Sequence, residues 1–390
     1  MKNNLKAQFL IDPEITFLNF GSFGATPKPI FDKYQQLQRQ MELQPVQFVV
    51  SDGIKLLKEA REKLAAYVHC NADDLVYVTN PSYAINAISK SFPLSEGDEI
   101  LATNLEYGAL DRTWDYYCDK TGAKYVRQNI QLPIKDKETF LNDFWKGYSS
   151  NTKAIFISQI TSFTGLILPV KEICEQAKKR GLITIVDGAH VPGHIDLNIS
   201  NLQADIYTGA CHKWMMAPKG ASFLYVSKEH QYWVDPLVIS WGFKSDVPSY
   251  SQFLDYHQMN GTRDYTAFLA VPTCIDFMEE HNWKQVSLEC KALVLEYAPK
   301  FCALTKAQPL APLTSEFFGQ LFSIPIQTSD PLKLKSALWD TYKIEVPVMV
   351  ENDKVYLRYS INAFNSAADL DRLYVVLVEL KGELWTEFSK

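Results

Sequence analysis

The stretches LITIVDGAH (182–190) and ADIYTGACHK (204–213) decide the fold of this chain. Each begins with a short, largely apolar run and ends in small and polar residues. Short strands without a polar face are typical of a sheet that is buried on both sides. We therefore expect two strands of a covered sheet, with Asp187, His212 and Lys213 at or just beyond their ends.

The rest of the first 265 residues repeats this pattern. Short apolar runs predict strands, and segments with helical periodicity lie between most of them. The expected strands cover 75–79, 99–103, 123–126, 153–158, 182–187, 204–209 and 221–226, and the expected helices cover 29–44, 52–68, 83–92, 107–121 and 169–180. Strands separated by helix-length connections indicate βαβ units and a mostly parallel sheet, so the fold class is α/β.

The pattern changes after about residue 265. Long helical stretches come first, and a few strands and a last helix follow them. The expected helices cover 267–280, 283–304 and 367–384, and the expected strands cover 321–326, 343–348 and 355–361. Few strands with helices at the ends indicate a smaller α+β domain. We expect a large domain over 26–265 and a small domain over 266–390.

Composition excludes several classes of protein. The 390 residues are 47% hydrophobic and 22% charged, as in globular proteins, and the net charge of −6 gives no support to a nucleic-acid or membrane surface. No apolar run approaches the ~20 residues of a membrane span. The first residues lack the apolar core of a signal peptide, so we expect a cytoplasmic protein. Seven cysteines without a CxxC pair indicate reduced thiols and no metal site.

The polar residues at two of the strand ends could have a catalytic role. Asp187 ends an apolar strand, where an unpaired carboxylate is costly. It could cap a helix, form a structural ion pair, or hold a heterocyclic nitrogen protonated. Lys213 follows His212 and precedes the apolar Trp214, so desolvation could turn its amine into a Schiff-base nucleophile. Taken alone, a lysine is far more often a solvated surface group.

Two further segments lie between a strand and a helix. Asn80-Pro81-Ser82-Tyr83 offers a helix N-terminus and a hydroxyl, which is the outline of a phosphate site or a simple helix cap. Tyr107 follows the strand over 99–103 and could stack on a planar ligand or belong to the core. Ligands of open α/β sheets bind at the carboxyl ends of strands. An amine, a carboxylate, an aromatic ring and an anion site together match the parts of pyridoxal 5′-phosphate.

Seven motifs along the chain resemble those of the class V aminotransferase family of fold-type I pyridoxal-phosphate enzymes, and most closely its isopenicillin N epimerase-like branch. The motifs are LNFGSFGATPKPI (18–30), TNPSYAIN (79–86), ITSFTGLILPV (160–170), VDGAHVPG (186–193), TGACHKWMMAPKG (208–220), NGTRDYTAFLAV (260–271) and LRYSINAFNSAADLDRL (357–373). The resemblance spans nearly the whole chain. It implies a large pyridoxal-phosphate domain, a smaller C-terminal domain, and an N-terminal segment over 1–25 that joins the small domain and the active site.

The resemblance also assigns roles around the cofactor. It implies that Lys213 forms the Schiff base, that Asp187 pairs with the pyridinium nitrogen and that His190 lies near the ring hydroxyl. It places Tyr107 on the ring face. The residues that it turns toward the phosphate are Ser82, the backbone at Tyr83, and His212.

Further matching positions concern the substrate and the partner subunit. The resemblance implies that Thr262 reaches the phosphate of a neighbouring subunit, so we expect a homodimer. It makes Arg358 the clamp for the carboxylate of a small amino-acid substrate, although a buried ion pair with a nearby acid is the alternative. Asn19 and Ser22 are expected to line the substrate side, and Ser162 to lie near the cofactor.

The expected reaction takes place at the α-carbon of an amino acid or amino-acid conjugate. Epimerisation and carbon–sulfur lysis lead, with transamination as the alternative. A persulfide mechanism is disfavoured because the last cysteine, Cys302, precedes the strands around Arg358. A nicotinamide oxidoreductase would need a GxGxxG turn, which is absent. An inactive binding scaffold would usually have lost Lys213, Asp187 or Arg358.

Overall fold

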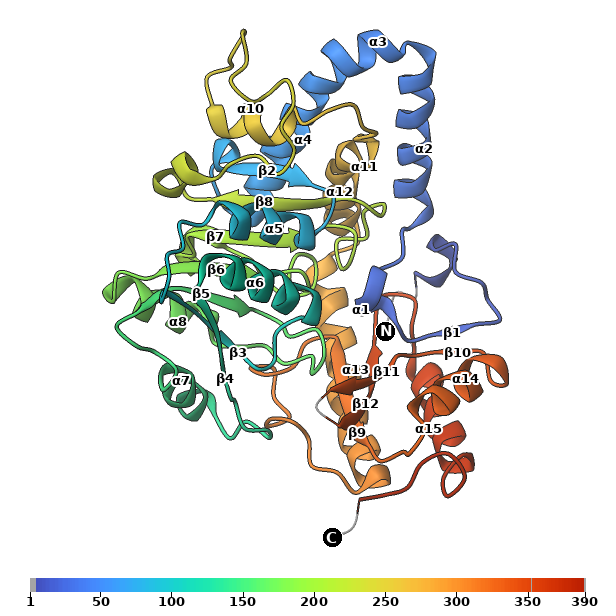
Figure 1. Cartoon of the computed structure of the whole chain (residues 1–390). Coiled ribbons are helices and arrows are strands. Elements are labelled where there is room, and N and C mark those ends of the chain that lie inside the picture. The colour runs from blue at the N-terminus through green and yellow to red at the C-terminus, as the bar shows by residue number, and fades with distance from the viewer. Residues whose placement is uncertain (1–4, 352, 389–390) are drawn as a thin grey trace.

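A computed structural model describes residues 5–351 and 353–388 (Figure 1). Its main feature is a seven-stranded sheet in the order β2-β8-β7-β6-β5-β3-β4. The strands are β2 (Leu75–Val78), β3 (Glu99–Thr103), β4 (Lys124–Gln128), β5 (Thr152–Ser158), β6 (Ile183–Asp187), β7 (Ile206–Ala210) and β8 (Ser222–Val226). The strand β8 runs opposite to the other six strands of this sheet, which are parallel to one another. The prediction of an α/β fold with a mostly parallel sheet is confirmed.

Both faces of this sheet are buried, as the apolar strands predicted. Along β5, Ile155 and Ile157 belong to one apolar cluster, while Ala154 and Phe156 belong to another. Alternate residues of a strand point to opposite faces, so the two clusters are the two sides of the sheet. One side is covered by α4 (Gly53–Val68), α8 (Val170–Lys179) and α12 (Val271–Glu280), and the other by α5 (Pro81–Ser91) and α6 (Gly108–Thr121).

A second, smaller sheet lies toward the C-terminus. Its order is β11-β12-β9, all antiparallel, with β9 (Leu321–Ile326), β11 (Val348–Glu351) and β12 (Lys354–Ser360). A separate parallel pair joins β1 (Thr16–Phe17) to β10 (Ile344–Glu345). Residues 16–17 therefore lie beside the last third of the chain (Figure 1).

Proline accounts for two departures from the predicted elements. The strand expected over 343–348 is wrong, because β10 ends at Glu345 and β11 begins after Pro347, which has no N–H for a sheet ladder. The helix expected over 267–280 is divided into α11 (Thr266–Leu269) and α12, with Pro272 in the first turn of α12.

The remaining elements are mostly helices. Those that pack around the small sheet are α13 (Trp283–Thr305), α14 (Pro331–Asp340) and α15 (Ala367–Glu379). The others are α1 (Phe20–Phe23), α2 (Lys28–Leu43), α3 (Pro45–Gln47), α7 (Lys137–Trp145), α9 (Ile199–Leu202) and α10 (Gln252–Gln258), with 3-10 turns at Lys6–Gln8, Ala72–Asp74 and Lys228–Trp233 and a π turn at Phe48–Asp52.

Two expectations from composition can be compared with this structure. All seven cysteines are free thiols, as predicted. Across residues 5–351 and 353–388, no helix is long and apolar enough to cross a membrane. The domain boundaries at residues 25 and 265 stay a prediction.

Candidate active site

The parallel pairing of β6 and β7 brings the two key motifs to one edge of the sheet. Asp187 ends β6, and Lys213 follows the end of β7 by three residues. A glycine after Asp187 allows this close packing, since a Cβ on Gly188 would lie 2.0 Å from the Tyr207 hydroxyl. The loop after β6 carries His190, whose Nε2 lies 3.0 Å from the Nζ of Lys213.

Lys213 holds its amine in an environment that disfavours charge. Partial burial lowers the pKa of Lys213 to about 8. The Asp187 carboxylate opposes this shift of the pKa, and the Arg358 guanidinium adds to it. An amine with such a pKa has a substantial neutral fraction near neutrality, and the neutral form is the one that acts as nucleophile or base.

Asp187 is a buried carboxylate with few partners. It is 4% exposed, and burial raises its pKa. Among the described residues, the Ala189 N–H is its hydrogen-bond donor, at 2.9 Å, and no side chain forms an ion pair with it. The alternatives of a helix cap and a structural ion pair for Asp187 are therefore not favoured. A buried carboxylate in this state favours a ligand that brings a donor.

Arg358, on β12, is the complementary case of a buried cation. It is 3% exposed, and burial lowers its pKa to about 10. Its guanidinium donates to the carbonyl of Ser162 and, at 3.0 Å, to the hydroxyl of Ser22. The Ser22 hydroxyl in turn donates to the Asn19 side chain at 2.5 Å. No carboxylate of the described residues pairs with Arg358, so the alternative of a structural ion pair is wrong.

The residues expected at the phosphate site differ in whether their polar atoms are already engaged within the protein. Asn80 caps α5 and accepts the N–H of Tyr83 at 2.8 Å, so that N–H is already used. Ser82 lies in the first turn of the same helix. His212 donates its Nδ1–H to the Ala221 carbonyl at 3.0 Å, and burial lowers its pKa to about 4, which leaves Nε2 to face a ligand. Thr262 is exposed on the loop between α10 and α11.

Tyr107 lies in the turn between β3 and α6 and is 46% exposed, so it is not a core residue. The preceding Glu106 was not predicted as a site residue. It is buried, accepts from Thr103 at 2.6 Å and from the Ser158 N–H at 2.7 Å, and burial raises its pKa to about 8. It ties the turn that carries Tyr107 to β5. A strand-end acid beside an aromatic residue was the signal in the sequence.

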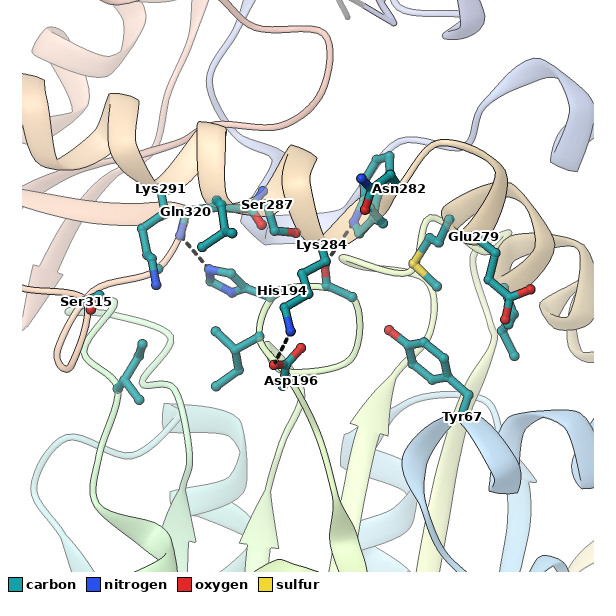
Figure 2. A pocket seen from close by; sticks show the side chains of 18 residues that line it. Tyr67, His194, Asp196, Glu279, Asn282, Lys284, Ser287, Lys291, Ser315 and Gln320 are labelled. Atoms are coloured by element: carbon teal, nitrogen blue, oxygen red, sulfur yellow. Dashed lines mark hydrogen bonds and ion pairs between the residues drawn. The ribbon is translucent and has the colours of Figure 1, made fainter. Parts of the chain in front are cut away.

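A cavity of about 670 Å³ is lined in part by residues 193–196 of the loop after β6 (Figure 2). His194 of the loop after β6 and Lys291 of α13 are among the residues that line it, whereas Lys213, Asp187 and Arg358 are not. Lys284 forms an ion pair across it with Asp196, at 3.8 Å. This cavity is therefore separate from the group around Lys213.

The side chains around Lys213 fit pyridoxal phosphate. They provide an amine for its aldehyde, a half-exposed aromatic residue near the same edge, and, for its ring nitrogen, a buried carboxylate to which no side chain of the described residues donates. Arg358 remains as a cation that no carboxylate of residues 5–351 and 353–388 pairs with, next to the hydroxyls of Ser22 and Ser162.

Known proteins resemble this chain in sequence and in fold. A family model for aminotransferase class-V matches residues 24–373. The isopenicillin N epimerase of Amycolatopsis lactamdurans is 31% identical, over 97% of this chain and 98% of that protein. The hercynylcysteine sulfoxide lyase of Schizosaccharomyces pombe is 23% identical, over 92% of each. A solved cystine C–S lyase in complex with cysteine persulfide has the same fold, with a TM-score of 0.83 and 17% identity over 94% of this chain and 98% of that one.

Proposed function

The chain belongs to the class V aminotransferase family, and on that premise we propose that Lys213 removes the α-proton of an amino acid whose carboxylate is held by Arg358. The protein is a pyridoxal-phosphate enzyme, an epimerase or a carbon–sulfur lyase, and transamination is not favoured. The observation that carries the proposal is that Asp187 and Arg358 are buried and form no ion pair among the described residues, while burial lowers the pKa of the Lys213 amine to about 8.

The cofactor, when bound, supplies an electron sink for the charge that develops at the α-carbon. Asp187 would keep a proton on the ring nitrogen, since a buried carboxylate without a counterion favours a cationic donor. Lys213 would hold the cofactor through Nζ, release it when the substrate amine takes its place, and accept the α-proton at the same atom. Burial keeps that atom neutral enough to do so.

Arg358 would orient the substrate. Its planar fork can bind a carboxylate through two parallel hydrogen bonds. Ser22 and the Ser162 carbonyl hold the guanidinium in place, so little side-chain entropy remains to be lost on binding. The α-carbon of a bound amino acid would then be fixed relative to the amine of Lys213.

We also propose a homodimer in which Thr262 reaches the phosphate site of the partner. The loop that carries Thr262 is exposed, and large apolar side chains are exposed in the same part of the chain. Trp241 and Val247, for example, are 81% and 86% exposed. Apolar exposure of this kind is typical of an interface. Mixing subunits that carry Lys213→Ala with subunits that carry Thr262→Ala should then restore activity that neither variant has alone.

Exchange of the α-hydrogen in D₂O tests the shared step of both reactions. The holoenzyme is incubated with D and L amino acids and with cysteine conjugates, and deuterium at the α-carbon is measured by NMR. Inversion of configuration identifies an epimerase, and release of a sulfur product identifies a lyase. Lys213→Ala should abolish exchange, while Lys219→Ala should keep it. Exchange that survives in Lys213→Ala would refute the role of Lys213.

A further inference from the structure

The hydrogen-bond chain at Lys213 continues behind His190. The indole Nε1 of Trp214 lies 3.2 Å from His190 Nδ1, while His190 Nε2 lies 3.0 Å from Lys213 Nζ. Both rings are buried, with 0% of Trp214 and 2% of His190 exposed. Each nitrogen of His190 therefore has one partner, and the two partners differ in what they can donate.

These contacts leave one tautomer for the imidazole. An indole N–H can only donate, so Nδ1 of His190 must be the acceptor and carry no hydrogen. Burial, and then the charge of Lys213, lower the pKa of His190 well below its ordinary value, so the ring is neutral. Its one hydrogen is then on Nε2, and it points at Lys213. An N–H donor at that place meets the lone pair of a neutral amine and repels an ammonium group.

The indole is itself held firmly. Its ring stacks on His194 with centroids 4.0 Å apart and an angle of 25°, and Phe20 packs at 5.3 Å. His194 donates from Nδ1 to the His190 carbonyl at 2.9 Å and accepts the Gln320 N–H on Nε2 at 2.6 Å, as Figure 2 shows for the second contact. Trp214 therefore presents its N–H to His190 in a fixed direction.

We propose that Trp214 is a positioning residue that keeps the hydrogen of His190 on Nε2 and so favours the neutral, reactive form of Lys213. The inference deepens the proposed function, since it takes Lys213 as the reactive amine. Loss of the indole N–H frees His190 Nδ1 to carry the hydrogen. Nε2 can then accept from a lysine ammonium, which stabilises the charged and unreactive form.

Other charged or titratable groups also face this pair. Asp187 and Arg358 act on Lys213, and Arg358, His194 and His212 act on His190. Trp214→Phe changes none of these groups and keeps an aromatic ring against His194. A change in the pKa of Lys213 in that variant is therefore due to the loss of the indole N–H.

The experiment uses cofactor-free protein, so its outcome does not depend on turnover. Imidazole ¹⁵N chemical shifts show which nitrogen of His190 carries hydrogen, with the signals assigned by their loss in His190→Gln. Acetylation of Lys213 as a function of pH gives the midpoint for the neutral amine. Trp385→Phe is the matched control, because Trp385 is equally buried and donates its Nε1–H to the Leu377 carbonyl at 2.8 Å, outside this network.

In the wild type and in Trp385→Phe, the hydrogen is expected on Nε2. In Trp214→Phe it should move to Nδ1, and the acetylation midpoint should rise on the order of one pH unit, the size of one hydrogen bond to a charged group. A hydrogen on Nδ1 in the wild type overturns the proposal, and this holds even if Trp214→Phe does not fold. An unchanged tautomer and midpoint in a folded Trp214→Phe overturn it as well. Failure to find the cofactor on Lys213 after borohydride reduction would instead refute the proposed function and leave the tautomer result intact.

Discussion

The two halves of the site are assembled in different ways. The amine half, with Asp187, His190 and Lys213, comes from two adjacent strand ends, and His190 and Lys213 are 23 positions apart. The carboxylate half joins Arg358 to Ser162 and Ser22, which are 196 and 336 positions away. In the first half, Asp187 and Arg358 have opposite effects on the pKa of Lys213, whereas in the second half the buried Arg358 has no counterion among the described residues. The residues proposed for reactivity are thus assembled locally, and those proposed for substrate recognition depend on the tertiary structure.

The amine half should fail completely when its nucleophile is removed. Lys213→Ala is expected to lower kcat on the order of 10⁴-fold or more, because one atom both holds the cofactor and moves the proton. Borohydride reduction and peptide mapping should place the cofactor on Lys213 in the wild type. The same treatment should label Lys219→Ala as it labels wild type. Cofactor found on Lys219 in the wild type would contradict the assignment.

A second variant separates chemistry from binding within the amine half. Asp187→Asn is expected to reduce kcat by about 10²–10⁴-fold, because a neutral amide cannot keep the ring nitrogen protonated. The cofactor should still bind, since the other contacts remain. Stopped-flow rates and cofactor content after dialysis measure the two effects. Full turnover in this variant would mean that Asp187 is only structural.

The carboxylate half should fail in binding. Arg358→Ala is expected to raise KM by the equivalent of about 2–5 kcal/mol, since a charge-assisted contact is lost. The cofactor absorbance should stay as in wild type, and Arg358→Lys should rescue only in part, since a point charge cannot reproduce the fork. Steady-state kinetics with an amino acid and with its decarboxylated amine provide the comparison. Equal losses for both substrates would argue against a carboxylate clamp.

The smallest expected effect is an electrical coupling between the two halves. Wild-type Lys213 in cofactor-free protein should become reactive as pH rises through about 8, because its lowered pKa leaves the neutral form dominant above that value. The charge of Arg358 lowers the pKa of Lys213, so Arg358→Gln should move the pH midpoint of amine labelling up. Asp187→Asn removes a charge that raises the pKa and should move the midpoint down. Amine labelling measures both, and shifts in the same direction would show that the halves are not coupled in this way.

Local pattern predicted the amine half well, for a physical reason. The runs over 182–187 and 204–209 are apolar on both faces, and their strands end within a residue of the predicted position at Asp187 and Ala210. Parallel neighbours meet at their carboxyl ends, so the meeting of Asp187 and Lys213 follows from the pattern. The insertion of β8 as an antiparallel strand between β2 and β7 did not follow, because pairing between distant strands has no local signal.

What the sequence did not predict is which atoms the buried side chains contact. The sequence placed Trp214 in an apolar setting, but it could not show that the indole N–H meets His190. Glu106 was part of a recognised strand end, yet its two donors, Thr103 and Ser158, come from different strands. The place of a residue in the periodic pattern predicts which face of its helix or strand the side chain is on. Which atom the side chain contacts depends on the register between elements.

The pairing of β1 with β10 has a consequence for the order in which the protein is made. Residues 16–17 leave the ribosome early, and their partners at 344–345 are translated near the end. Ser22 is likewise translated long before its hydrogen-bond partner Arg358. Domains fold in order during synthesis, and contacts between distant residues form late. The edge that carries Asp187 and Lys213 is therefore translated before Arg358, and we expect the residues proposed for the cofactor to come together in the nascent chain before those proposed for the substrate.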